Sequence, residues 1–127
     1  MTPENILNAA IGVLEMRGRC RGNYELGDGS VDPLGALAVA AGLEPDDWMG
    51  LRTLPESQIA GGDRVLVDAA WFLVAAAVPR VETWHLPVDD MVRALGDWAD
   101  CASDAEILGA LTKAAHHAGQ VLEVTRG

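Results

Sequence analysis

The residues most able to do chemistry lie in one short stretch, RCRGNYELGDGSVDP, at positions 19–33. Cys20 stands between Arg19 and Arg21, and neighbouring cations lower the pKa of a thiol, so a nucleophilic thiolate is one chemistry that this pattern indicates. The sequence brings no histidine close to serve as its base. A partly buried thiol that only packs is therefore the favoured interpretation, and a reactive thiol is the alternative.

Paired carboxylates suggest a second chemistry, either general acid–base catalysis or binding of a divalent metal. Asp28 and Asp32 lie in the same stretch, and Asp97 and Asp100 are three residues apart, which places them on one face of a helix. Such pairs are common on an acidic surface, so surface charge is the favoured interpretation. The Gly27–Gly29 segment lacks the following lysine of a phosphate-binding loop and predicts a turn.

Metal ligands do not cluster in the sequence. Cys20 and Cys101 form no C-x-x-C motif. His116 and His117 are adjacent, hence about 100° apart around a helix and poorly placed to share one metal ion. We therefore expect no metal and no cofactor, and two reduced thiols.

Tryptophan supplies most of the aromatic residues, at positions 48, 71, 84 and 98. Trp71 and Trp98 occupy apolar positions of helical repeats, which predicts that they belong to the core. Trp84, in the segment VETWHLP, falls outside these repeats, and an exposed tryptophan is a common anchor for a partner protein. Burial of Trp84 in the core is the favoured interpretation, and a partner contact is the alternative.

Apolar residues recur at helical spacing through most of the chain. Thr2 and Asp32 each precede a proline, as N-cap residues often do, and Ser103 with Glu106 forms a capping box. Asp63 is the expected N-cap of a further helix, and Gly119 the expected end of the last one. The predicted helices cover residues 3–17, 33–41, 63–78, 87–98 and 104–118, with a shorter helix around residue 48 and one extra turn within 54–59.

The composition favours a small all-α protein. The 127 residues suit a single domain, and half of them are apolar while only 5% are aromatic. We expect a compact bundle of about five helices with a small hairpin or irregular loop near residues 20–32. The segment 63–78 is apolar on nearly every side and should be the central helix, so Asp68 is expected to lie at an exposed edge or to pair with an arginine, and a role as a site residue is the alternative.

The sequence LGAL occurs twice, at residues 34–37 and 108–111. Gly35 and Gly109 therefore sit inside predicted helices, where glycine costs about 0.5–1 kcal/mol relative to alanine. Close approach of a neighbouring helix would compensate for that cost. We interpret the repeat as the same packing solution used twice and not as a duplication.

The charge of the chain limits its partners. Nineteen acidic residues against nine basic ones give a net charge of −10, which disfavours nucleic acids and anionic lipid surfaces. The first residues lack the pattern of a secretory signal, and the most apolar run, residues 65–78, is shorter than the roughly 20 residues that cross a bilayer. We expect a cytoplasmic protein without a membrane span.

Two segments, RGRCRGNYELGDGSVDPLGALAVAAG and LGDWADCASDAEILGALTKAA, resemble an uncharacterised family of small helical proteins from actinobacteria and their phages. Its members read R-G-W-C-x-G, then C-x-L-G-A-L, and near the end W-N-D. The chain departs from this pattern at Arg19, Asp32 and Ala99, which replace tryptophan, the second cysteine and asparagine. The resemblance implies a helical fold and no particular activity. The matching residues are Arg17, Gly18, Cys20, Gly22, Leu34, Gly35, Ala36, Leu37, Trp98 and Asp100.

Two functions are favoured by the sequence, while imitation of nucleic acid and a purely structural role stay as lesser alternatives. The first is a small acidic interaction or regulatory protein, phage-encoded in one version of the hypothesis, that binds another protein or a second copy of itself. The alternative is an enzyme or small-ligand-binding protein that uses the loop from Cys20 to Asp32, and binding is favoured over catalysis. We also predict that the two ends of the chain meet, with Asp100 within reach of one of the nearby arginines. The candidate binding residues are Arg17, Arg19, Cys20, Arg21, Asp28, Asp32, Trp84, Trp98 and Asp100.

Overall fold

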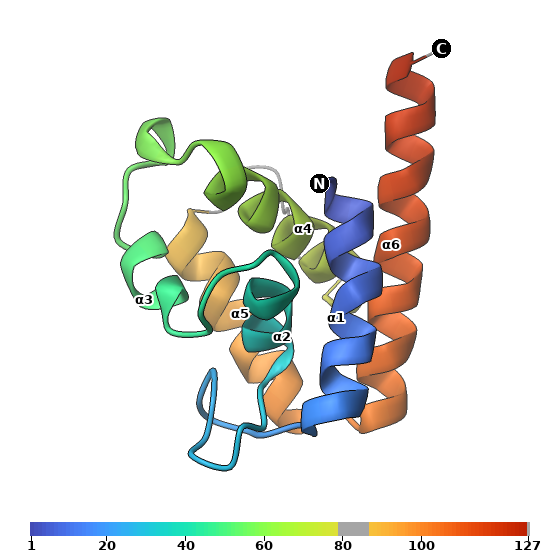
Figure 1. The fold of residues 1–127 in the computed structure, drawn as a ribbon. Helices are drawn as coiled ribbons and strands as arrows, with labels where there is room; N and C mark the ends of the chain where they lie inside the picture. The colour runs from blue at the N-terminus through green and yellow to red at the C-terminus, as the bar shows by residue number, and fades with distance from the viewer. Residues whose placement is uncertain (79–86, 127) are drawn as a thin grey trace.

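The computed structural model of the chain describes residues 1–78 and 87–126. These residues form helices joined by loops and contain no β-strand, so the predicted all-α class is confirmed. Trp84 lies outside the described residues. The elements in chain order are α1 (Pro3–Arg17), α2 (Pro33–Ala40), α3 (Asp47–Leu51), the short 3-10 helix η1 (Glu56–Gln58), α4 (Gly61–Ala77), α5 (Val88–Cys101) and α6 (Asp104–Arg126) (Figure 1).

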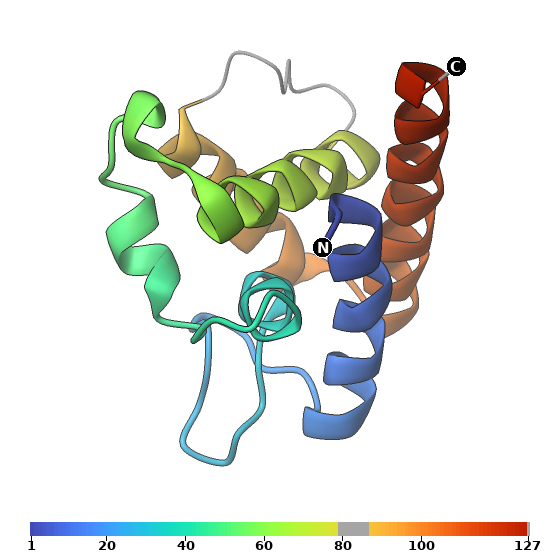
Figure 2. The same ribbon diagram turned by 45° about the horizontal axis from the view of Figure 1, so that its top comes forward.

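The bundle is organised around α4. Helices α1 and α6 lie side by side and run in opposite directions, with the end of α1 beside the start of α6 (Figures 1 and 2). Helix α4 packs against both of them and also against α2 and α5, which confirms its predicted central position. One continuous cluster of buried aliphatic side chains fills the space between these helices. None of the helices in the described ranges combines the length and the apolar character of a membrane span.

Three helices begin where the sequence predicts them to begin. The hydroxyl of Thr2 accepts a hydrogen bond from the backbone N–H of Asn5 at 3.2 Å. Ser103 and Glu106 form the expected reciprocal capping box, in which each side chain accepts from the backbone N–H of the other residue. Asp32 caps α2 in the same way. Each cap pairs a backbone N–H of the first helical turn that the helix itself leaves free.

Three predicted helix boundaries are wrong. Helix α5 continues past residue 98 to Cys101. Helix α4 begins at Gly61, with Ala60 at the N-cap position, so Asp63 lies inside the first turn, where its charge suits the helix dipole. Helix α6 continues past Gly119. Gly119 faces α1, and a Cβ atom there would lie 2.9 Å from the carboxylate of Glu4. This glycine therefore lies inside a helix, opposite the side chain of Glu4, and does not end one.

Asp68 pairs with an arginine, which is one of the two outcomes expected for it. The guanidinium of Arg64, one turn earlier on α4, lies 2.9 Å from the Asp68 carboxylate and 4.6 Å from the centre of the Trp71 ring. Trp71 is only partly buried against the core. Trp48 is fully buried, and its indole N–H donates to the Leu34 carbonyl at 2.7 Å.

The two LGAL glycines have different environments. A Cβ atom on Gly35 would overlap the backbone carbonyl oxygen of Tyr24, so close approach is confirmed there, although the neighbour is a loop and not a helix. Gly109 is exposed, and a Cβ atom on it would meet nothing within 4 Å. The close approach predicted for Gly109 is therefore wrong.

This difference predicts opposite effects of the same substitution. Gly35→Ala should lower the free energy of unfolding by about 2 kcal/mol or more, because the added methyl group displaces the loop that carries Tyr24. Gly109→Ala should raise it by about 0.5–1 kcal/mol, because alanine favours an open helical position. Urea unfolding of both variants measures the two changes. A loss of stability in both, or in neither, would contradict the assignment.

Candidate functional site

The stretch from residue 18 to residue 32, called the loop below, is an ordered irregular segment. The N–H of Cys20 donates to the carbonyl of Val31 at 3.0 Å, and the N–H of Val31 donates to Gly18 at 3.1 Å. A tight turn is closed by the N–H of Leu26, which donates to Ser30 at 2.9 Å. The predicted hairpin or irregular loop is therefore present as an irregular loop with two isolated β-bridges.

Arg19 ties the loop to the carboxyl end of α5. Its guanidinium donates to the carbonyls of Ala99 and Ala102, at 3.0 and 2.9 Å, and lies 2.5 Å from the carboxylate of Asp104. The Arg19 side chain is only 9% exposed. Because the last carbonyls of a helix lack partners within the helix and carry partial negative charge, a cation is stabilising at this place.

The predicted meeting of the two chain segments is confirmed by further contacts at the same helix end. The carboxylate of Asp100 accepts the backbone N–H of Gly22 at 3.0 Å, and the side chain of Arg21 donates to the Asp100 carbonyl at 3.2 Å. The partner expected for the Asp100 carboxylate was a guanidinium, and it is instead a backbone N–H. Within the described ranges the guanidinium–carboxylate pairs of the loop are Arg19 with Asp104 and Arg17 with Glu25.

Trp98 lies on α5 near these contacts and, like Trp71, packs against the core but is only partly buried. The stacking of an arginine on its ring is not seen in the described part of the chain, where the cation over a tryptophan is Arg64 over Trp71. Trp98 thus supports the helix that holds the loop.

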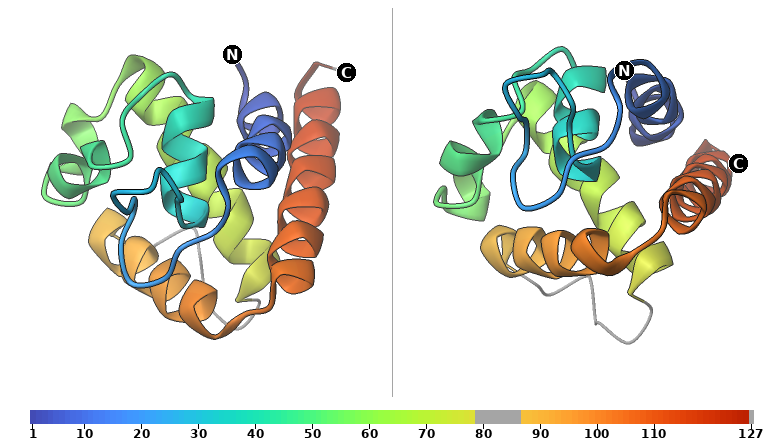
Figure 3. Two further views of the ribbon diagram at one scale, coloured as in Figure 1. Left: turned by 60° about the horizontal axis from the view of Figure 1, so that its bottom comes forward. Right: turned by 90° about the horizontal axis from the view of Figure 1, so that it is seen from below.

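A cleft of about 390 Å³ opens between the loop, the segment that contains α3, and α5. The loop runs alongside α5, so residues far apart in sequence form the two walls (Figure 3). We call this hollow the acidic cleft, because five carboxylates and two guanidinium groups line it. The charged lining residues are Glu25, Asp32, Asp46, Asp97, Asp100, Arg52 and Arg93.

The two cations of the acidic cleft are already paired. Arg52 donates to Asp89 at 2.5 Å and to the hydroxyl of Tyr24 at 2.9 Å, while Arg93 lies 3.1 Å from the other Asp89 oxygen. The hydrogen bond from Arg52 lowers the pKa of Asp89, and the same bond raises the pKa of Arg52. Both guanidinium groups are therefore held by one carboxylate outside the cleft lining.

Several carboxylates of the acidic cleft have no cation beside them. The side chains of Asp46 and Asp97 make no hydrogen bond or ion pair to any residue that the structure describes, and the carboxylate of Asp100 accepts a backbone N–H, while Arg21 binds the Asp100 backbone carbonyl. Asp46 lies beside α3 and the other two on α5. Negative charge is thus concentrated on both walls of the cleft.

Asp32 is the buried member of this group, with 6% of its surface exposed. Its Oδ1 accepts the backbone N–H of Gly35 at 2.7 Å and so caps α2. Burial raises the pKa of Asp32 from its usual 3.8 to about 7, and the charge of Asp100 adds to the rise. Near neutral pH this side chain therefore exists in both protonation states at the wall of the cleft.

Asp28 does not join Asp32 in a site. It is exposed, and its Oδ1 accepts from both the N–H and the hydroxyl of Ser30, at 2.9 and 2.6 Å. These hydrogen bonds lower the pKa of Asp28. Asp28 thus shapes the turn of the loop.

Cys20 is buried, as the packing interpretation expects, with 5% of its surface exposed. The expectation that Arg19 and Arg21 lower its pKa is wrong. Burial raises the pKa of the thiol, and the charge of Asp32 raises it further. Both arginines donate hydrogen bonds to the end of α5 instead. Sγ donates to the Asn23 carbonyl at 3.2 Å.

The histidines of α6 lie elsewhere. His116 and His117 are exposed, and the ring of His117 packs edge-on against Phe72 with 5.6 Å between ring centres. No group of three or more potential metal ligands occurs among the side chains of residues 1–78 and 87–121.

The Tyr24–Arg52–Asp89 cluster at one end of the cleft was not predicted from the sequence. Its members are separated by 28 and 37 residues and belong to no motif. One signal was available, since Arg52 is the only basic residue between positions 22 and 63. An isolated cation in an acidic segment indicates a fixed carboxylate partner.

The model of a family described as "Family of unknown function (DUF6197)" matches residues 1–117. The chain belongs to this family. No curated protein and no solved structure matches this DUF6197 protein. The family match spans the loop, both segments that meet at α5 and every residue that lines the acidic cleft.

The attachment of the loop to α5 in this DUF6197 protein can be measured. Arg19→Lys should lower the free energy of unfolding by about 1–3 kcal/mol, because an ammonium group cannot reach all three acceptors and leaves buried carbonyls unpaired. Arg21→Lys is the matched control, and since Arg21 is exposed it should change the free energy by less than about 0.5 kcal/mol. Equal losses in urea unfolding would contradict this role of Arg19.

The buried carboxyl group predicts a specific pH dependence. The native state holds the Asp32 proton more tightly than the unfolded chain does. This group therefore lowers the free energy of unfolding as pH rises from about 4 to about 7, by at most about 4 kcal/mol. Above that range it adds no further pH dependence to the free energy of unfolding. Asp32→Asn keeps an oxygen that accepts the Gly35 N–H. In urea unfolding, the free energy of unfolding of the variant relative to the natural protein should be higher at about pH 8 than at about pH 5. A stability difference that is the same at both pH values would contradict the raised pKa.

Proposed function

We propose that this DUF6197 protein is a small protein-interaction or regulatory protein whose acidic cleft receives a lysine or arginine side chain of a partner protein. The observation that carries the proposal is the charge balance of the cleft. Its own cations are paired with Asp89, whereas the Asp46 and Asp97 side chains have no partner among the described residues. A bound cation would compensate this negative charge.

The geometry suits a single long basic side chain. The cleft has walls from the loop, from the segment around α3 and from α5, and carboxylates stand on more than one wall. A charged hollow with walls of low dielectric constant concentrates its electric field, and that field speeds the approach of an oppositely charged partner. The net charge of −10 on the whole protein also attracts a positively charged partner.

The proposal extends to the setting of the protein. We propose that the protein acts in the cytoplasm of an actinobacterium and is encoded by the bacterium or by a phage. If a phage encodes it, the expected partner is a host protein. A second copy of the chain is the other partner to consider. Both expectations come from the resemblance and from the acidic sequence.

A second candidate function has one specific observation in its favour. Asp32 lines the cleft, is nearly buried and has a pKa raised to about 7, which is the state in which a carboxyl group can both donate and accept a proton. The candidate is a small-ligand-binding protein or enzyme that uses the loop. Among the described residues, no histidine or cysteine lines this cleft.

The proposed function predicts which peptides the protein selects from a random library displayed on messenger RNA. Enriched peptides should contain lysine or arginine, and their affinity should fall as salt is added, because the charges that attract them are screened. The double variant Asp46→Asn/Asp97→Asn should weaken their binding by at least about tenfold. Fluorescence anisotropy with purified peptides measures each affinity.

The control is Asp63→Asn/Asp90→Asn, which removes the same charge at positions outside the cleft lining. It should retain most of the affinity. Enrichment of peptides without basic residues, or equal losses in the two double variants, would overturn the cleft as the site. A library that yields no binding peptide would count against the interaction function itself.

A further inference from the structure

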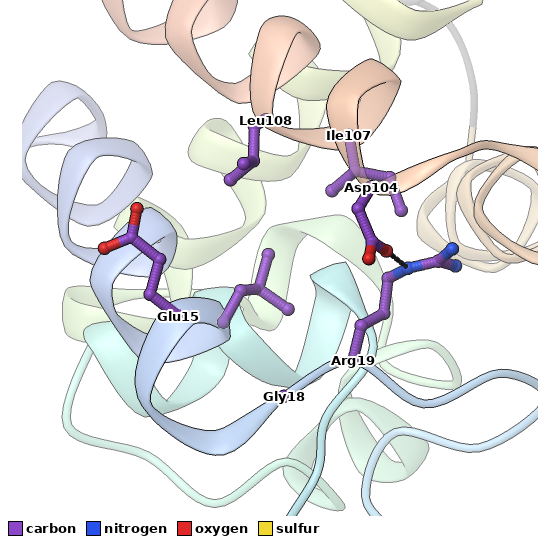
Figure 4. A pocket seen from close by; sticks show the side chains of 7 residues that line it. Glu15, Gly18, Arg19, Asp104, Ile107 and Leu108 are labelled. Atoms are coloured by element: carbon purple, nitrogen blue, oxygen red, sulfur yellow. Dashed lines mark hydrogen bonds and ion pairs between the residues drawn. The ribbon is translucent and has the colours of Figure 1, made fainter.

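A second hollow, of about 210 Å³, lies where α1 ends and α6 begins, and we call it the apolar pocket (Figure 4). Leu14, Ile107 and Leu108 form its floor and one side. The core behind it is closed, since Leu14 and Ile107 are almost fully buried and Leu108 is partly buried. The pocket is thus a dent in the surface lined mainly by hydrocarbon.

Two features keep the apolar pocket open. Gly18 turns the chain away from α1 with a φ of 81°, a conformation that favours glycine, and no side chain covers the floor at this point. Arg19 forms the neighbouring wall, and its guanidinium is fixed by Ala99, Ala102 and Asp104. The wall cannot swing into the hollow without breaking these hydrogen bonds.

The rim of the apolar pocket is acidic. Figure 4 shows Glu15 and Asp104 on opposite sides of it. Glu15 is exposed and makes no side-chain hydrogen bond or ion pair to the described residues, and the Asp104 side chain is 78% exposed although one oxygen contacts Arg19. The guanidinium of Arg19 is already paired with Asp104 and with the carbonyls at the end of α5.

We infer that the apolar pocket binds an apolar side chain of a partner protein that carries a lysine or arginine next to it. The volume is sufficient, because an apolar cavity of about 150 Å³ can hold a benzene molecule. The acidic rim favours a neighbouring cation and disfavours an anion. This inference rests on the proposed function for the nature of the partner as a protein, but the preference of the pocket can be tested without that partner.

The apolar pocket and the acidic cleft are linked by the loop. Gly18 and Arg19 border the pocket, and residues 22–25 border the cleft. Buried apolar anchors supply most of the affinity in protein interfaces, while surrounding charges supply orientation and speed of association. The preferred partner segment therefore combines one apolar anchor with basic residues.

Phenethylammonium is a suitable probe, because it joins an aromatic ring to a cation, and phenylpropionate is its anionic counterpart. In methyl NMR spectra, phenethylammonium should cause saturable shifts at Leu14, Ile107 and Leu108, and phenylpropionate should bind at least severalfold more weakly. Leu108→Gln should weaken binding of the cationic probe. Ala105→Gln, on the exposed face of the same helix, is the matched control and should leave binding unchanged.

Glu15→Gln provides a second variant, at an exposed position that does not support the core, and it should reduce the preference for the cation. Absence of saturable shifts at the pocket methyl groups, or equal affinity for the two probes, would overturn the inference. The outcomes separate the two proposals. If only the Asp46→Asn/Asp97→Asn variant loses peptide binding, the cleft is supported as a partner site and the apolar pocket is excluded. If only Leu108→Gln loses peptide binding, the apolar pocket is supported and the cleft is excluded.

Discussion

The three acceptors around Arg19 fix the relation between the loop and the helices. Moving a guanidinium group out of water is costly, and here the cost is offset by two helix carbonyls and one carboxylate arranged around it. The same contacts pair the last carbonyls of α5 and hold the first residue of α6. Arg19 also lines the apolar pocket, and the loop that it attaches to α5 continues into residues 22–25, which line the acidic cleft.

Most arginine side chains that the structure describes form ion pairs with carboxylates of the same protein. In the described part of the chain, each arginine that forms an ion pair does so with a carboxylate of a nearby loop or helix, and several of these pairs are partly shielded from water. The negative charge that remains is carried by carboxylates without such partners, and the cleft collects several of them. The net charge of −10 therefore has a local consequence at one hollow. The pairs are Arg17 with Glu25, Arg19 with Asp104, Arg52 and Arg93 with Asp89, and Arg64 with Asp68 and Glu56.

Local signals in the sequence predicted the features that depend on neighbouring residues. The caps at Thr2, Asp32 and Ser103 involve partners three residues away, so a short pattern contains all the necessary information. The two LGAL segments show where such patterns fail. The same four letters place Gly35 against a loop carbonyl and Gly109 against solvent, because the space around a helix is set by distant parts of the chain.

The candidate site was predictable only in part for the same reason. The loop and its contact with α5 were expected, since an arginine-rich segment in an acidic chain requires fixed partners. The acidic cleft was not, because its far wall comes from the region of α3 and from Arg93 and Asp97 of α5. Cys20 illustrates the opposite error. Its neighbours in sequence are cations, but it is buried with Asp32 near it in space, and burial and the charge of Asp32 raise its pKa.

Asp32 connects the stability of the fold to the proposed activity. It caps α2 in either protonation state, because a carbonyl-type oxygen remains to accept the Gly35 N–H. Its ionised form is disfavoured by burial and by Asp100, so a cation placed in the acidic cleft would favour ionisation and lower the pKa of Asp32. Binding of a basic side chain would then release a proton near neutral pH. By linkage, the affinity of the cleft for that side chain must rise with pH through the same range in which the free protein loses the Asp32 proton.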